Sequence, residues 1–180
     1  MTLKSWSGST EFELKVLGYE FPQITGDKYD SNWLMVNVTV KTVEASWSST
    51  DPCMLTWESH WLLNWLADLV YGAESEADMS FMESNLEFVL DGRHNGTIGL
   101  RICFREKLRP PAPTSGDDDF EIHLELLPSD IRDAVKVFRH DLQPFPIRAG
   151  ASWRCRPQND RRTSCVLCTP DDLNENSAAD

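Results

Sequence analysis

The amino-acid sequence predicts an α+β fold, mainly an antiparallel β-sheet of about five to six strands with two amphipathic helices packed on one face. Three observations support this class. Apolar and polar residues alternate in several separate stretches, as they do in strands that bury one face. Two other stretches repeat their apolar residues with the period of a helix. The connections between the strand stretches are too short for the crossovers of a parallel sheet.

The first two strands are predicted from strict alternation. In residues 11–17 every second residue is apolar, and Gly18 ends the stretch. Residues 34–41 give the clearest alternation in the chain, with aliphatic side chains on one face only. Residues 48–52, Ser-Ser-Thr-Asp-Pro, have the composition of a turn, which predicts that the second strand ends before them.

A first amphipathic helix is predicted between Thr56, its expected N-cap, and Gly72, its expected C′ residue. Apolar side chains fall on one broad face, whereas Glu58 and Ser59 fall largely on the opposite side. The apolar face carries tryptophans at i, i+4 and i+8, with Trp61 at the centre. Such a stripe fits either a ligand-stacking surface or the side of a helix that packs on a sheet, and we interpret it as core.

The following segments predict a hairpin, a further strand and a second helix. Residues 86–90 and 98–104 alternate and flank the turn residues 91–96, which is the pattern of a hairpin. Residues 120–126 alternate in the same way and form another strand. The second helix begins near Pro128 and is stopped by two prolines after its last apolar turn.

The domain is predicted to close near residue 148, where apolar periodicity stops. We therefore expect one α+β domain over residues 1–149, within the usual size of a domain. Residues 150–180 are rich in Arg, Ser, Asn, Asp and Pro, and they predict a polar, disordered tail.

No stretch of the sequence predicts a membrane segment or an export signal. The longest uncharged apolar run, residues 61–67, is far shorter than the roughly 20 residues that span a bilayer. Residues 1–10 contain no continuous apolar segment of the kind that a cleaved signal needs. The five cysteines fit reduced thiols better than a disulfide framework. We therefore expect a cytoplasmic protein that makes no membrane contact.

The charge of the chain is concentrated before the tail. The net charge is −12. Residues 150–180 contain four arginines and five acids, so residues 1–149 carry the other 13 basic and 24 acidic side chains, or −11. Such a field repels phosphate backbones, which argues against nucleic-acid binding and favours a basic protein partner. The alternative is that the charge serves solubility alone.

The common catalytic motifs are absent from the sequence: it contains no G-x-S-x-G elbow, no P-loop and no H-E-x-x-H helix. The best metal-ligand candidates are Glu121, His123 and Glu125, because strand alternation places the three side chains on one face. The alternative is a solvated polar face, which needs no metal. We predict no cofactor, and a metal-dependent enzyme that uses this face stays an alternative.

A second metal candidate lies in the tail, where Cys155 precedes the C-x-x-C pair Cys165 and Cys168. A closed structural zinc site needs four ligands, and the tail contains no histidine and no further cysteine. Cys53 or Cys103 of the domain would have to supply the fourth thiolate. We interpret the tail cysteines as free thiols.

Several short patches carry a family resemblance. They are Tyr29-Asp-Ser-Asn-Trp-Leu34 with the directly following Met35-Val-Asn-Val-Thr-Val40, Leu55-Thr-Trp-Glu58, Phe81-Met-Glu-Ser-Asn-Leu86, and Phe145-Pro-Ile-Arg148. Together they resemble the WapI-type immunity proteins, a family of small bacterial proteins from contact-dependent polymorphic toxin systems. The likeness extends from Glu11 to Arg148.

The resemblance implies an inhibitor without catalytic residues that binds a toxin domain and blocks its active site. The negative charge of the chain fits a basic toxin domain. We predict that the partner contacts Asp117, Asp118 and Asp119 in a proline-flanked loop, together with Glu121 and Glu125. A metal-dependent enzyme, or a structural domain with no link to a toxin, are the alternatives.

Overall fold

The computed structural model describes residues 1–72, 77–111 and 119–148. Its elements confirm the predicted α+β class with antiparallel strands. The predicted tail, residues 150–180, lies outside the described residues. In chain order the elements are β1 (Thr2–Lys4), β2 (Glu11–Tyr19), β3 (Trp33–Lys41), β4 (Ser46–Leu55), α1 (Thr56–Tyr71), β5 (Asp78–Ser80), β6 (Leu86–His94), β7 (Thr97–Phe104), the 3-10 helix η1 (Glu106–Leu108), β8 (Phe120–Leu126) and α2 (Pro128–Leu142).

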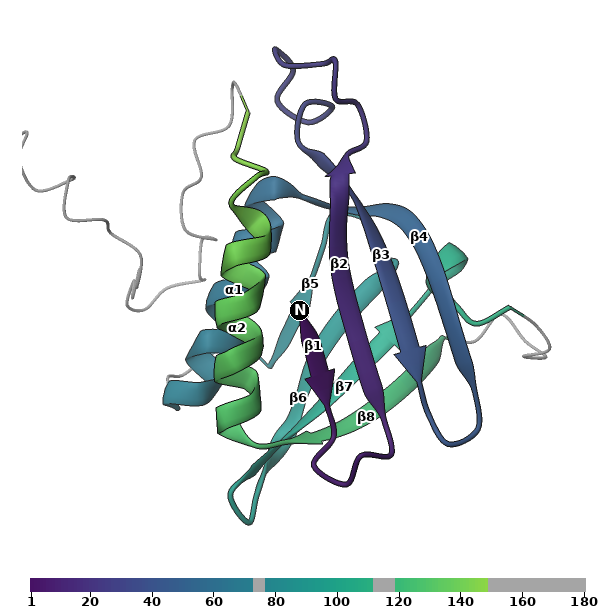
Figure 1. Ribbon diagram of the computed structural model, residues 1–180, viewed down its shortest axis with the longest axis vertical. Helices are drawn as coiled ribbons and strands as arrows, with labels where there is room; N and C mark the ends of the chain where they lie inside the picture. The colour runs from purple at the N-terminus through teal and green to yellow at the C-terminus, as the bar shows by residue number, and fades with distance from the viewer. Residues whose placement is uncertain (73–76, 112–118, 149–180) are drawn as a thin grey trace, which may run out of the picture.

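The strands form two four-stranded antiparallel sheets that face each other (Figure 1). Sheet A has the strand order β1-β2-β3-β4, and sheet B has the order β5-β6-β7-β8. The sequence predicts a single sheet, so the number of sheets differs from the expectation. The physical reason is that two helices are too few to cover the apolar faces of eight strands, and the two inner faces therefore cover each other.

Both sheets and the first helix share a core of aromatic side chains. The ring of Phe12 in β2 lies 5.7 Å from the ring of Phe88 in β6 and 6.1 Å from that of Phe104 in β7, measured between centroids. Trp65 of α1 reaches the same cluster, with its ring centroid 6.4 Å from that of Phe88. A side chain of sheet A thus packs directly on sheet B.

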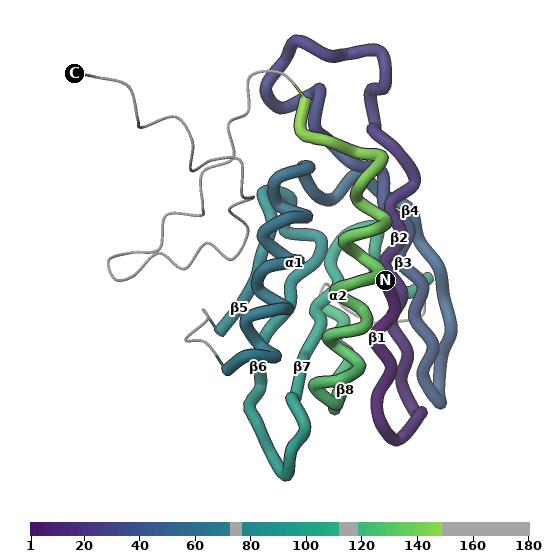
Figure 2. Tube along the Cα trace, turned by 60° about the vertical axis from the view of Figure 1, so that its left-hand side comes forward, coloured from purple at the N-terminus to yellow at the C-terminus, as the bar shows by residue number. Residues whose placement is uncertain are grey.

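The two helices run side by side along one side of the sheets (Figure 2). The apolar face predicted for α2 is buried, as the side chains of Ile131, Val135, Phe138 and Leu142 show. Within the part of the chain that the structure describes, neither helix is long and apolar enough to cross a membrane.

Two of the three tryptophans in the apolar stripe of α1 lie in the core. Trp57 and Trp65 are buried, whereas Trp61 is only half-buried and packs against the edge of the core. Gly72 ends the helix as predicted, because its φ of 68° is left-handed and its N–H donates a hydrogen bond to the carbonyl of Asp68.

The predicted start of α1 is wrong in two respects. The N-cap residue is Leu55, and Thr56 is the first helical residue. Glu58 and Ser59 are buried, although their positions on the helix predict exposure. Glu58 is buried because its carboxylate accepts hydrogen bonds from two backbone N–H groups, those of Leu55 at 2.8 Å and Met82 at 2.7 Å.

The turn predicted at residues 48–52 is also wrong, because these residues lie inside β4. Pro52 pairs with Met35 at the point where the register between β3 and β4 shifts. β4 is an edge strand of sheet A, and an edge strand accommodates a proline because no further strand needs its missing N–H. The three-residue strands β1 and β5 are too short for alternation to predict.

Candidate functional site

The outer face of sheet B carries a continuous set of charged side chains. Strand alternation and register place them there: Glu87 and Glu121 flank Cys103, and His123 lies beside Arg101. We call this surface the charged face. It consists of Glu87 and Asp91 of β6, Arg101 and Cys103 of β7 with the adjoining Arg105, and Asp119, Glu121, His123 and Glu125 in and before β8.

Arg105 joins three segments at one end of the charged face. Its Nη2 lies 2.8 Å from Oε2 of Glu87, and its Nε lies 2.6 Å from Oδ2 of Asp119. Its Nη1 also donates a hydrogen bond to the carbonyl of Ser84 at 3.1 Å. Asp119, predicted as a partner-binding residue, is therefore already held by an arginine of its own chain.

Arg101 makes a similar pair of contacts in the middle of the charged face. Its Nη1 lies 2.8 Å from Oε1 of Glu121, and its Nε lies 3.2 Å from Oδ1 of Asp91. The other oxygen of Asp91 lies 3.1 Å from Nδ1 of His123. Burial and the neighbouring Glu121 raise the pKa of the Cys103 thiol to about 11, so this thiol is protonated at neutral pH and is no nucleophile.

Glu125 lies at the border between the two sheets. Its Oε2 accepts a hydrogen bond of 2.8 Å from Nε1 of Trp6, whose side chain is largely exposed. Its carbonyl accepts a second hydrogen bond, of 2.9 Å, from the backbone N–H of Trp6. The segment after β1 is thereby fixed to β8, and Trp6 places an aromatic ring beside the charged face.

The three proposed metal ligands of β8 do not converge on one point. Glu121 binds Arg101, His123 binds Asp91, and Glu125 binds Trp6. Across the described ranges, no group of three or more His, Cys, Asp or Glu side chains is arranged to hold a metal ion. The geometry therefore favours the solvated polar face over a metal site.

Several candidates from the sequence lie outside the described residues. They are Asp117 and Asp118 of the proposed partner-binding loop, and Cys155, Cys165 and Cys168 of the tail. Their roles stay predictions.

The patches that carry the family resemblance meet in space around Asn32. Its Oδ1 accepts hydrogen bonds from Oγ1 of Thr56 at 2.7 Å and from the backbone N–H of Arg148 at 2.9 Å. The guanidinium of Arg148 then donates to the carbonyls of Pro22 and Ile24. Asn32 thus ties the loop before β3 to the start of α1 and to the segment after α2.

The remaining patch, residues 81–86, joins the same end of the molecule. Its Met82 N–H is bonded to Glu58 in α1, as described above. Nδ2 of Asn85 donates to Oδ2 of the buried Asp51 in β4 at 2.8 Å. These polar residues hold loops together, which explains why they stand outside any apolar period in the sequence.

A family model described as the immunity protein WapI-like family matches residues 2–146 of the chain. The chain belongs to this family. No curated protein matches it. Membership supports an immunity-type role in which the chain binds another protein.

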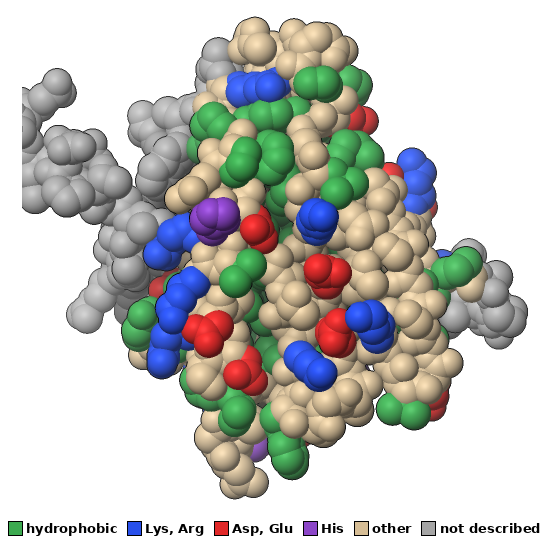
Figure 3. Space-filling view, in the orientation of Figure 1, with side chains coloured by type: hydrophobic (Ala, Val, Ile, Leu, Met, Phe, Trp, Pro, Cys, Tyr) green, Lys and Arg blue, Asp and Glu red, His purple; other side chains and the backbone are tan. Residues whose placement is uncertain are grey.

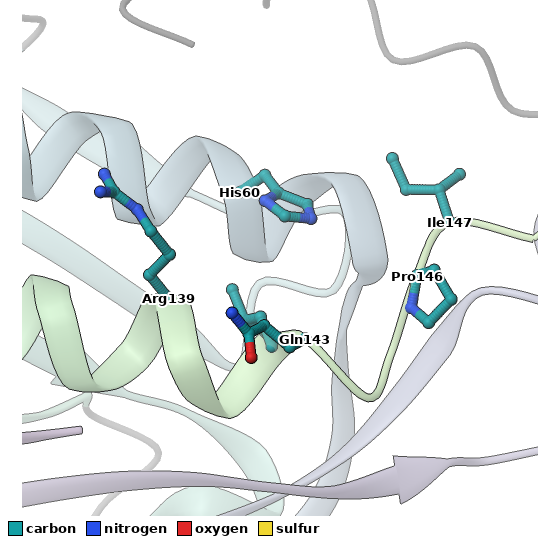
Figure 4. A pocket seen from close by; sticks show the side chains of 6 residues that line it. His60, Arg139, Gln143, Pro146 and Ile147 are labelled. Carbon is teal, nitrogen blue, oxygen red and sulfur yellow. The ribbon is translucent and has the colours of Figure 1, made fainter. Parts of the chain in front are cut away.

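The chain also has an open pocket of about 450 Å³ between the start of α1 and the end of α2 (Figure 4). Burial lowers the pKa of His60, so its imidazole is neutral at pH 7. Among the described residues that line the pocket, His60 and Arg139 carry the ionisable side chains. The lining residues are His60, Arg139, Leu142, Gln143, Pro146 and Ile147.

Proposed function

We propose that this chain is a non-enzymatic immunity protein that binds a cognate bacterial toxin domain and blocks the active site of that toxin. Membership of the family supports the protein-binding part of this proposal. The observation that carries the rest is the excess of carboxylates on the charged face.

The charged face has five carboxylates and two guanidinium groups, leaving His123 aside. Each arginine is shared by two carboxylates, so the ion pairs neutralise only part of the acidic charge. Carboxylate oxygens accept more than one hydrogen bond and therefore keep capacity for a further donor. A basic toxin surface supplies such donors, and its attraction to a chain of net charge −12 accelerates encounter.

We also propose that the chain acts in the bacterial cytoplasm. Cys53 and Cys103 are free and buried, which suits a reducing compartment.

The first test is protection. The C-terminal domain of a toxin encoded beside the gene for this chain is expressed in a bacterial host with and without the chain. We expect cells that express the toxin domain to grow only when they also express the chain, and we expect the two purified proteins to form a complex. Failure of the chain to protect or to bind that domain would remove the proposed function.

The second test measures the role of charge. We expect the triple variant Asp119→Asn, Glu121→Gln, Glu125→Gln to associate with the toxin domain about tenfold more slowly at low salt, with little change in dissociation. The matched control removes the same charge elsewhere, through Glu11→Gln, Glu13→Gln and Glu44→Gln on the side of sheet A. Equal slowing of both variants would mean that only net charge matters and that the charged face is not the interface.

A further inference from the structure

Two exposed apolar side chains, Tyr29 and Met82, lie in loops that contact the first turn of α1. The loop that carries Tyr29, between β2 and β3, projects beyond sheet A (Figure 1). Tyr29 of this loop is 42% exposed, and its ring meets that of the buried Trp57 at a centroid distance of 6.0 Å. Met82, in the loop before β6, is 56% exposed. We call the exposed Tyr29 and Met82, together with the buried Trp57 that Tyr29 contacts, the anchor patch. Large apolar side chains are enriched at the centres of protein interfaces.

The anchor patch is held in place before any partner arrives. Oδ1 of Asp27 accepts hydrogen bonds of 2.7 Å from the backbone N–H groups of Tyr29 and Asp30. The backbone N–H of Met82 is bonded to Glu58, the neighbour of Trp57 in α1. Both loops are thus fixed to the same turn of α1, so little conformational entropy is lost when a partner binds them.

Carboxylates lie in both loops of the anchor patch, because Asp30 follows Tyr29 and Glu83 follows Met82. Burial raises the pKa of Glu20, and the nearby negative charges of Asp51, Asp30 and Glu83 raise it further, although Lys107 opposes them. Lys107 itself is engaged with Asp51, at 3.3 Å. This end of the molecule therefore has more acid than its own basic side chains neutralise.

The ring of Tyr29 already holds a cation. Nζ of Lys28 lies 5.0 Å from the ring centroid, a distance typical of cation–π contacts. An aromatic ring beside carboxylates is the environment that suits a guanidinium, whose plane stacks on the ring while its N–H groups bind oxygen.

The loop that carries Met82 is bonded to the charged face. Arg105, which binds Glu87 and Asp119, also donates to the carbonyl of Ser84, two residues after Met82. A partner that covers the end of the charged face is therefore placed to reach the loop of Met82 as well.

We propose that the anchor patch is the centre of the toxin interface and that its occupant is an arginine-bearing basic surface of the toxin domain. Arginine side chains of that surface pack on Tyr29, where they replace Lys28, and on Met82, and their guanidinium groups bind the carboxylates of Asp30 and Glu83. This inference rests on the proposed function. It adds that the apolar contact sets the lifetime of the complex, while the charged face sets the rate of encounter.

The test uses the full chain and the purified toxin domain of the protection experiment. We expect Tyr29→Ala and Met82→Ala each to raise Kd by about tenfold or more, mainly through faster dissociation. Tyr71→Ala and Val43→Ala are the controls, since they remove an exposed aromatic and an exposed aliphatic side chain elsewhere; both side chains are more exposed than Tyr29 and Met82. We expect the controls to leave Kd within about twofold.

Two further variants separate binding from folding. Tyr29→Phe keeps the ring and is expected to bind like the parent chain. Met82→Lys, at an exposed loop position, is expected to weaken binding more than Met82→Ala, because it opposes a basic partner. Thermal unfolding midpoints within about 2 °C of the parent would show that these variants are folded.

The outcomes distinguish the two proposals. If the parent chain binds no toxin domain, the proposed function is wrong and this inference falls with it. If the parent binds but Tyr29→Ala and Met82→Ala bind within about twofold, the proposed function stands and the anchor patch is not the interface. If instead these variants abolish self-association in sedimentation, or if replacing the tail arginines by glutamine tightens binding, a second copy or the tail is the occupant, and the inference is overturned.

Discussion

The outer faces of sheet A and sheet B satisfy their polar side chains in different ways. On sheet A, Nδ2 of Asn37 donates to the hydroxyls of Ser48 at 2.9 Å and Thr50 at 3.0 Å, and the hydroxyls of Thr39 and Ser48 lie 3.1 Å apart. These groups are neutral and bond to one another. The charged side chains of this face are interspersed in sign, as Figure 3 shows, and Glu11 lies between Lys4 and Lys41.

On sheet B the polar side chains are mainly carboxylates and guanidinium groups, and the carboxylates are in excess. Arg101 and Arg105 are each shared by two carboxylates, and Glu125 is bonded to a neutral indole. The neutral groups of sheet A contribute to the fold by bonding to one another, and they leave few donors or acceptors for a partner. A face with spare carboxylate oxygens can bind cations without breaking its own contacts. The two sheets therefore have the same topology and different surfaces for recognition.

The largest effect is expected from the core that supports both faces. Phe12→Ala removes a fully buried ring that touches Phe88 and Phe104 across the two sheets. We expect a loss of about 3–5 kcal/mol in the free energy of unfolding, because a cavity is left between the sheets. Chemical denaturation measures it, with the exposed Tyr71→Ala as the control. Separate unfolding of the two sheets would show that they do not share one core.

A smaller effect is expected from the ion pairs of the two outer faces. Arg105 is 30% exposed, binds two carboxylates and a carbonyl, and links β6 to the segment before β8. We expect Arg105→Ala to lower the free energy of unfolding by about 1 kcal/mol, since charge-assisted hydrogen bonds are lost. Lys41→Ala, which breaks the pair with Glu11 on sheet A, is expected to cost less. Denaturation of both variants measures the two losses. A larger loss for Lys41→Ala than for Arg105→Ala would contradict the contrast between the faces.

The fold was predictable where packing follows a local period. The alternation of residues 34–41 predicts β3, and the spacing of apolar residues predicts α2. Residues 48–52 mislead because their turn composition is tolerated at the edge of a sheet. Glu58 misleads because its burial depends on Met82, a residue 24 positions later in the chain.

The candidate site was predictable only in part, for a related reason. Alternation places Glu121 and Glu125 on the outer face, as the sequence indicates. It does not reveal that Arg101 lies across from His123, because cross-strand partners depend on strand order and register. The exposure of Tyr29 and Met82 is decided by loop contacts, which leave no period in the sequence.

The smallest effect is expected in how stability depends on pH in the acid range, and it comes from Glu11 on sheet A. The hydrogen bond from Lys41 lowers the pKa of Glu11 below its ordinary value of 4.5 in the folded chain. The ionised carboxylate therefore contributes stability above pH 4.5, and this contribution is lost as the pH falls through the lowered pKa.

Glu11→Gln removes the titration, so the difference in stability between parent and variant should be constant at neutral pH and shrink toward zero in acid. Glu13→Gln, on the same strand and face, is the control, because Glu13 makes no ion pair within the described residues. Denaturation at a series of pH values measures the difference. A Glu11→Gln variant whose stability parallels that of the parent through the acid range would mean that the Lys41 contact is too screened by water to matter.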